Sequence, residues 1–120
     1  MSAGLSFPKT RRLTRTAEFA QVRREGKVFR GDLFTLATAT APVPAEKMRI
    51  GIIASRKVGG AVIRNRVRRR IREIVRKQQD RVAPGVWIVV ILSARSGRAS
   101  YRALEDEWLR LAGRAFILAP

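Results

Sequence analysis

The stretch from residue 56 to residue 77, RKVGGAVIRNRVRRRIREIVRK, combines dense positive charge with a regular apolar pattern. Ten basic residues against one acid, Glu73, give it a net charge of +9, more than half of the +17 carried by the whole chain. Its apolar residues recur at spacings of three and four, the period of a helix with one buried face. These residues are Ile63, Val67, Ile71 and Ile74. The pattern predicts a helix over residues 61–77 that docks by one stripe and exposes a rigid cationic surface.

The choice of cation indicates what this surface binds. The chain has 21 arginines among its 26 basic residues. A guanidinium group bonds phosphate through two parallel donors and stacks on bases, whereas an ammonium group is a hydrated point charge. An ordinary solvated face is the alternative interpretation. However, so many neighbouring cations repel one another unless a polyanion neutralises them, so the sequence favours a nucleic-acid-binding protein.

Length and composition limit the other possibilities. A chain of 120 residues with 46% hydrophobic residues is expected to form one globular domain over residues 1–120, in which residues 1–12 form a mobile basic arm. Cysteine and histidine are absent, which excludes disulfides, thiolate or imidazole metal sites and histidine-based catalysis. The longest apolar run, residues 86–92, is too short to span a bilayer, and we expect a cytoplasmic protein without a signal peptide.

The remaining patterns predict an α-β-β-α-β-α order, hence an α+β two-layer sandwich. The second strand is expected to run antiparallel to the first, and the third to be buried on both faces inside the sheet. Residues 93–98 are expected to form a loop. Alternation in the strand over 27–40 is expected to put Leu33, Thr35 and Ala37 on one face and Phe34 and Leu36 on the other. The predicted elements are a helix over 15–25, a strand over 27–40 that a turn or bulge interrupts at 31–32, a strand over 48–54, the basic helix over 61–77, a strand over 86–92 and a helix over 101–116.

The acidic residues do not suggest a catalytic site. Glu105, Asp106 and Glu107 are consecutive, so on a helix their side chains point in different directions and do not converge on a metal. We interpret them as favourable to the helix dipole and to solubility. Ser100 is the expected cap of that helix, and Thr14 or Thr16 that of the first one. The chain is therefore expected to bind nucleic acid without contributing catalytic side chains or a metal site.

One segment carries a specific resemblance. Residues 57–72 are similar to the signature K-x-G-x-A-V-x-R-N-x-x-[KR]-R-x-x-R of the bacterial ribonuclease P protein subunit. Residues 49–55 also resemble that family's R-[IV]-G-x-x-[AV]-S run, and the similarity extends over nearly the whole chain. Every fixed position of the signature is met, by Lys57, Gly59, Ala61, Val62, Arg64, Asn65, Arg68, Arg69 and Arg72.

This resemblance implies a division of labour. In that family a separate catalytic RNA cleaves precursor tRNA at its 5′ end with Mg²⁺, which is expected on the RNA and not on this chain. The protein tightens precursor binding and lets the RNA work at lower magnesium. The resemblance also implies a left-handed β-α-β crossover around the basic helix. The protein is expected to be a monomer alone, with one copy for each RNA.

The same resemblance assigns two binding regions. The residues expected to bind the catalytic RNA are Arg56, Lys57, Arg64, Asn65, Arg66, Arg68, Arg69 and Arg72. Those expected in a cleft for the single-stranded 5′ leader are Arg12, Phe19, Arg23, Thr35 and Ala37. Arg23 and Ala37 depart from aromatic residues that the family carries, so phosphate contact by Arg23 is expected to replace part of the stacking. Ordinary core packing is the alternative role for Phe19.

Two other functions remain open from the residues. A structural ribosomal protein would have the same charge and the same kind of fold, without a catalytic partner. Attachment to an anionic membrane would require exposed apolar residues beside the cations. The apolar stripes are expected to be committed to a core, which disfavours the membrane interpretation.

Overall fold

The computed structural model describes residues 12–13, 15–41, 48–115 and 117–118, so most of the expected basic arm lies outside the described residues. It confirms the α+β class and the order of the helices. The helices and strands are α1 (Thr16–Glu25), β1 (Lys27–Arg30), β2 (Phe34–Thr40), β3 (Arg49–Ile53), α2 (Ala61–Lys77), β4 (Val86–Leu92) and α3 (Tyr101–Arg114). The short 3-10 helices are η3 (Arg56–Val58), η4 (Gln79–Arg81) and η5 (Ala94–Arg98), so the predicted loop at 93–98 is mostly a 3-10 helix.

The four strands form one mixed sheet in the order β1-β2-β4-β3. The predicted interruption at Gly31-Asp32 is a hairpin turn, which makes residues 27–40 two antiparallel strands. The strand over 48–54 was expected beside the first strand. Instead β3 pairs in parallel with β4, which separates it from β2. The seven apolar residues of β4 explain this position, because a strand that is buried on both faces belongs in the middle of the sheet.

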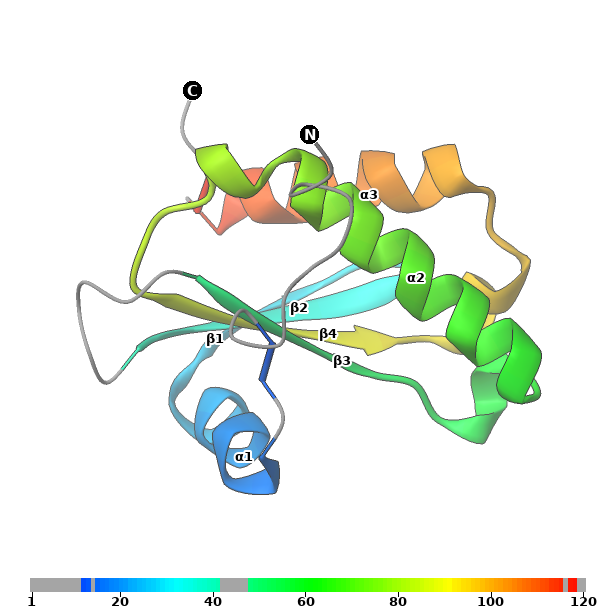
Figure 1. The fold of residues 1–120 in the computed structure, drawn as a ribbon, viewed down its shortest axis with the longest axis horizontal. Coiled ribbons are helices and arrows are strands. Elements are labelled where there is room, and N and C mark those ends of the chain that lie inside the picture. The colour runs from blue at the N-terminus through cyan, green and yellow to red at the C-terminus, as the bar shows by residue number, and fades with distance from the viewer. Residues whose placement is uncertain (1–11, 14, 42–47, 116, 119–120) are drawn as a thin grey trace, which may run out of the picture.

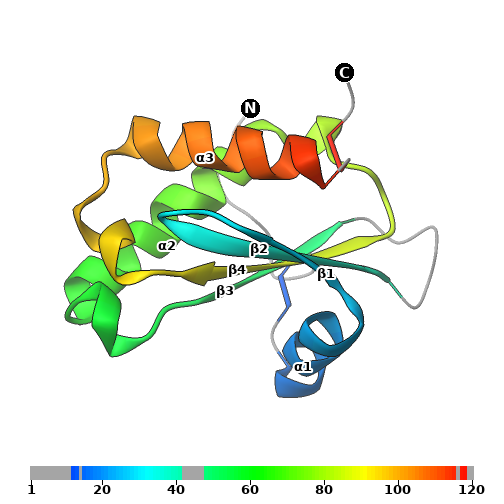
Figure 2. The same cartoon turned by 180° about the vertical axis from the view of Figure 1, so that it is seen from behind.

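The helices cover the two faces of the sheet unequally. Figure 1 shows α2 and α3 on one face and α1 near one end of the other, and Figure 2 shows the same layers from behind. The predicted stripe of α2 is confirmed, since Val67, Ile71 and Ile74 are at most 1% exposed in the main core. A smaller cluster, which includes Val22 of α1, fills the opposite face. α1 leaves the rest of that sheet face uncovered (Figure 1).

Strand alternation distributes the side chains of β2 between these two cores. Phe34 and Leu36 belong to the core under α2 and α3, and Ala37 belongs to the cluster under α1, as the sequence predicts. Leu33 was expected on the face of Ala37 but packs against the larger core, because it lies in the hairpin turn and outside the strand register.

The helix ends match the predictions in part. Ser100 caps α3 as expected, its hydroxyl accepting from the Ala103 N–H at 3.1 Å, and this helix ends at Arg114, two residues early. At α1 the N-cap is Arg15, not Thr16, and Thr14 lies outside the described residues. The Glu18 carboxylate accepts the Arg15 N–H at 3.0 Å, so an acid in the first turn makes the connection that we had assigned to a threonine.

Glu107 corrects the interpretation of the acidic cluster. Its side chain is only 6% exposed, and one carboxylate oxygen accepts the N–H groups of Leu33 and Phe34 at 2.7 and 3.0 Å. The other oxygen accepts from Arg110 at 2.9 Å. Glu107 therefore fastens the turn of the β1–β2 hairpin to α3, which is a structural role and not one of solubility. The sequence does not reveal it because the partners lie 73 and 74 residues away.

The connection β3–α2–β4 joins two neighbouring parallel strands through the basic helix. The left-handed sense of this crossover stays a prediction from the resemblance. Within the described ranges, none of the helices is long and apolar enough to cross a bilayer.

Candidate nucleic-acid interface

The first candidate surface is the side of α2 that faces away from the sheet. Its buried stripe fixes the rotation of the helix, so the cationic residues must occupy the remaining circumference. Of the predicted contacts, Asn65, Arg66 and Arg69 are exposed on α2, and Arg64, Arg68 and Arg72 are half-buried. Arg56 and Lys57 are exposed in η3, immediately before this helix. The structure thus brings the predicted RNA-binding residues to one connected region.

The arginines of this region divide into two groups. Arg66 donates to the Gly97 carbonyl and Arg70 to the Ala99 carbonyl, both at 3.1 Å, so these two side chains hold the η5 segment against α2. Arg66 was predicted only as an RNA contact, and its structural bond adds a role. Arg68 instead donates to the Asn65 side chain at 3.2 Å on the exposed surface. Asn65 can therefore orient Arg68 for an external ligand.

Acidic side chains do not neutralise the arginines of α2 within the described ranges. In the described part of the chain, no ion pair within 4 Å involves an arginine of α2. Burial lowers the pKa of Arg72, and the positive charges of Arg12 and Arg68 lower it further. The Arg64 Nε is buried and has no hydrogen-bond partner among the described residues. A phosphate-rich ligand would supply both the missing charge and the missing acceptors.

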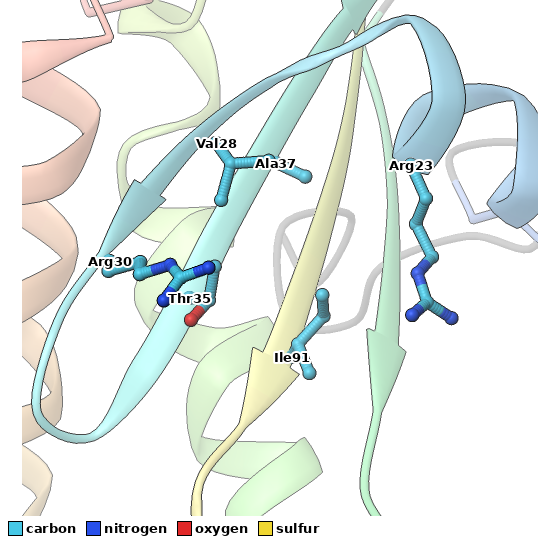
Figure 3. Close-up of a pocket in the computed structure, with 6 residues that line it drawn as sticks. All are labelled: Arg23, Val28, Arg30, Thr35, Ala37 and Ile91. Atoms are coloured by element: carbon cyan, nitrogen blue, oxygen red, sulfur yellow. The ribbon is translucent and has the colours of Figure 1, made fainter.

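The second candidate surface is a groove on the sheet face that α1 leaves uncovered. Its cavity volume is about 320 Å³. Figure 3 shows Arg23 on α1 and Arg30 on β1 flanking Thr35 and Ile91 on the strands between them. The six lining residues are Arg23, Val28, Arg30, Thr35, Ala37 and Ile91. None of the six is aromatic, so the groove combines an aliphatic floor with two cations.

Three of the five predicted cleft residues meet in this groove, namely Arg23, Thr35 and Ala37. Phe19 does not line it. The Phe19 ring packs on Gly51, where an added Cβ would lie 2.4 Å from the ring, and it is partly buried against the smaller cluster. Arg12 is also elsewhere. It forms a bridge with Ile50 on the outer edge of β3, and its charge acts on Arg72.

Val28, Arg30 and Ile91 also line the groove and were not predicted from the sequence. Strand register supplies the signal that could have found them. Val28 lies opposite Ala37, and Arg30 lies opposite Thr35 in the hairpin. Ile91 is the other neighbour of Thr35. Recognising residues 27–40 as a hairpin would have placed Val28 and Arg30 on the face of the expected cleft.

Among the described residues, metal ligation by the protein has no candidate site. Over the described ranges, no group of three or more acidic residues is placed to hold a metal ion, and the sequence contains no histidine or cysteine. What these side chains can do is bind anions, at α2 and in the groove.

Comparison with known proteins identifies the family. The ribonuclease P family profile matches residues 7–115. A ribonuclease P protein component from Picosynechococcus sp. is 37% identical over 108 residues, which cover 89% of this chain and 91% of that protein. One from Chloroflexus aurantiacus is 38% identical over 108 residues, covering 89% of this chain and 78% of that protein.

Solved structures agree. The ribonuclease P protein from Thermotoga maritima has a TM-score of 0.76 and 28% identity, covering 86% of this chain and 96% of that one. The Staphylococcus aureus protein has a TM-score of 0.83 at 22% identity, covers 90% of this chain and 97% of that one, and supports the fold alone. These matches favour the ribonuclease P interpretation over the ribosomal one. The chain belongs to the ribonuclease P protein family, whose members are the protein components of an RNA-based endoribonuclease that processes tRNA.

Proposed function

We propose that the exposed side of α2 binds the catalytic RNA, while the sheet groove binds the 5′ leader of precursor tRNA. The observation that carries this proposal is the separation of two cationic surfaces by one sheet. α2 packs on one face, and the groove opens on the other beside α1. A protein with this arrangement can hold two RNA segments at once.

The groove suits a single strand. A duplex presents its phosphates on a convex surface, whereas an unpaired strand can lay its bases on an apolar floor and its phosphates on flanking cations. Val28, which is 50% exposed, and Ile91 provide such a floor. Arg23 and Arg30 provide the cations. With no aromatic lining residue, phosphate contacts contribute more of the affinity than stacking does.

Charge also explains the expected effect on magnesium. Two RNAs repel each other, and divalent cations normally screen this repulsion. A protein of net charge +17 supplies part of the screening as fixed arginines. The Mg²⁺ that supports cleavage would be bound by the RNA. We place one copy of the protein on each RNA, acting in the cytoplasm.

The α2 assignment can be tested by cleavage of a precursor tRNA by a bacterial ribonuclease P RNA at low Mg²⁺. The wild-type protein should stimulate cleavage. The variant Arg64→Ala/Arg68→Ala should stimulate it at least about 10-fold less than the wild type does. Arg102→Ala/Arg114→Ala removes two exposed charges from α3 and serves as the matched control. Equal stimulation by all three proteins would exclude α2 as the RNA contact.

The groove assignment needs a substrate comparison. Arg23→Gln/Arg30→Gln should weaken binding of a precursor tRNA about 10-fold while leaving a leaderless tRNA unaffected. Arg24→Gln/Arg102→Gln removes the same charge from positions outside the groove. If the precursor and the leaderless tRNA weaken equally, the groove contributes only general electrostatic attraction.

A further inference from the structure

A second cavity lies where η3, η5 and the first turn of α2 meet. Its volume is about 490 Å³, within the range of small-ligand sites. Val58, Ile63 and Ala94 give it an apolar lining. Three exposed cations stand around it, namely Lys57, Arg95 and Arg98. Only Lys57 belongs to the residues already assigned to RNA binding.

Partly buried hydrogen bonds hold the walls of this cavity in place. On α2, Arg66 donates to the Gly97 carbonyl and Arg70 donates to the Ala99 carbonyl. These two hydrogen bonds hold η5 against α2. Within η5, Ser96 is fully buried and its hydroxyl donates to the Ser93 carbonyl at 2.7 Å. A five-residue segment between a strand and a helix is thus rigid, and it presents Arg95 and Arg98 from fixed backbone positions. Such preorganisation reduces the entropy cost of binding.

Two glycines allow the segments to approach this closely. A Cβ on Gly97 would lie 2.2 Å from the Val58 carbonyl oxygen, so η3 and η5 are in backbone contact there. Gly59 has a φ of 148°, which side-chain-bearing residues rarely adopt, and a Cβ on it would lie 2.9 Å from Ile63. Both glycines line the cavity, and larger residues would have to displace its walls.

The charge of the cavity selects the chemistry of its occupant. No acidic residue is among the eight described residues that line it, so its cations have no counter-charge there. A ligand with an anionic part and a flat apolar part fits this combination. An unpaired nucleotide has both, and proteins recognise RNA mainly through unpaired bases that leave the stack.

We propose that this cavity receives one unpaired nucleotide of the catalytic RNA, with its base against Val58 and Ile63 and its phosphates at Arg95 and Arg98. The inference rests on the proposed function and specifies a contact within it. The catalytic RNA is the occupant because Ile63 belongs to α2 and the arginines of α2 anchor η5. The same RNA that covers the exposed side of α2 therefore reaches the cavity.

The experiment uses the full chain with a bacterial ribonuclease P RNA that it activates. Dimethyl sulfate modifies unpaired adenines and cytosines, so it reports whether a base becomes covered when the protein binds. Arg95→Gln/Arg98→Gln removes the cations, and Ala94→Glu fills the cavity with a longer, anionic side chain. The matched controls are Arg102→Gln/Arg114→Gln and Gly113→Glu, which change the same charges on exposed parts of α3. Circular dichroism verifies that each variant is folded.

The wild-type protein should protect at least one unpaired base. Both cavity variants should lose that protection while other protected positions remain, and they should bind the RNA roughly 10-fold more weakly than their controls. For the arginine variant, the slope of log K against the logarithm of the salt concentration should also be less negative by about 1 to 2.

Three results would overturn the proposal. Unchanged base protection with weaker binding would reduce the cavity to a phosphate contact. Protection that appears only on precursor tRNA would assign the wrong RNA. Protection lost equally in the α3 controls would show a general charge effect. Failure of the wild-type protein to stimulate the RNA would instead contradict the proposed function itself.

Discussion

The exposed side of α2 and the sheet groove are both cationic, yet they are built in different ways. All of the α2 surface comes from 17 consecutive residues of one helix. The groove takes Arg23 from α1, Val28 and Arg30 from β1, and its remaining residues from β2 and β4. A helical surface is set by a period that is local in sequence, whereas a groove between elements depends on strand pairing and helix docking.

The two regions also depend on different supports. α2 is held by an apolar stripe that is almost fully buried. The hairpin that carries four of the six groove residues is fastened at its turn by hydrogen bonds with Glu107 and Ser93. Apolar burial is distributed over many contacts, whereas the turn is held by a few hydrogen bonds, two of which end on the Glu107 carboxylate. Damage to each support should therefore have a distinct signature.

The largest expected effect comes from charging the α2 stripe. Val67→Asp places a carboxylate at a position that is 0% exposed and should destabilise the fold by about 3–5 kcal/mol, disabling both surfaces together. Val62→Asp, in the same helix at a position 82% exposed, should change stability by less than about 0.5 kcal/mol. Urea denaturation followed by circular dichroism measures both. Similar stability of the two variants would contradict the position of the stripe.

Removing the turn support should cost less and act on one region. Glu107→Ala leaves the Leu33 and Phe34 N–H groups without their acceptor, at a cost of about 2–3 kcal/mol. Faster amide exchange at Leu33 and Phe34, with weaker precursor binding and unchanged binding to the catalytic RNA, is the expected pattern. Asp106→Ala, whose side chain is 69% exposed, is the control. An equal loss at both RNA sites would refute a hairpin-specific role.

Adding an aromatic ring should sharpen the contrast between the two surfaces. Val28→Tyr offers a stacking platform in the groove, where none of the lining residues is aromatic. Stacking contributes about 1–3 kcal/mol for each base, so we expect at least about a 5-fold gain in affinity for a precursor with an unpaired leader. A leaderless tRNA should show no gain. Competition binding with the two RNAs measures both affinities. An equal gain for both would place Val28 outside the leader path.

The smallest effect concerns repulsion within the α2 surface. Partial burial, and then the like charges of Arg12 and Arg68, lower the pKa of Arg72 by disfavouring its charged form. Arg72→Gln should stabilise the free protein slightly, by less than about 1 kcal/mol after solvent screening, while weakening RNA binding. The gain in melting temperature should shrink as salt is added. Arg69→Gln removes a charge from an exposed position of α2. It tests whether the loss of any α2 charge would stabilise the free protein and weaken RNA binding equally.

Much of the fold was predictable from local signals. The basic helix over 61–77 has the predicted bounds, because its stripe, its glycines and its length all agree. The apolar run 86–92 predicted an interior strand, and β4 lies between β2 and β3. The pairing of the strands was less predictable. A strand over 48–54 can lie beside either neighbour, and the choice of β4 depends on where α2 packs.

The candidate sites divide in the same way. The residues of the α2 surface follow from a motif within 16 positions, and the structure gathers them in one region. Of the predicted cleft residues, Arg12 and Phe19 lie outside the groove, whereas Val28, Arg30 and Ile91 line it without having been predicted. The role predicted for Glu107 was wrong because its hydrogen-bond partners belong to a turn that lies far away in the sequence.

By itself, the sequence determined the α+β class of this protein and an arginine-rich helix with the signature of its family. Charge, helical period and motif spacing are properties of neighbouring residues. Only the tertiary structure decided which cations remain available and which hold η5, where the groove opens, and where η3 meets η5. Those features depend on contacts between residues far apart in the chain, which are set only when the sheet and helices pack together.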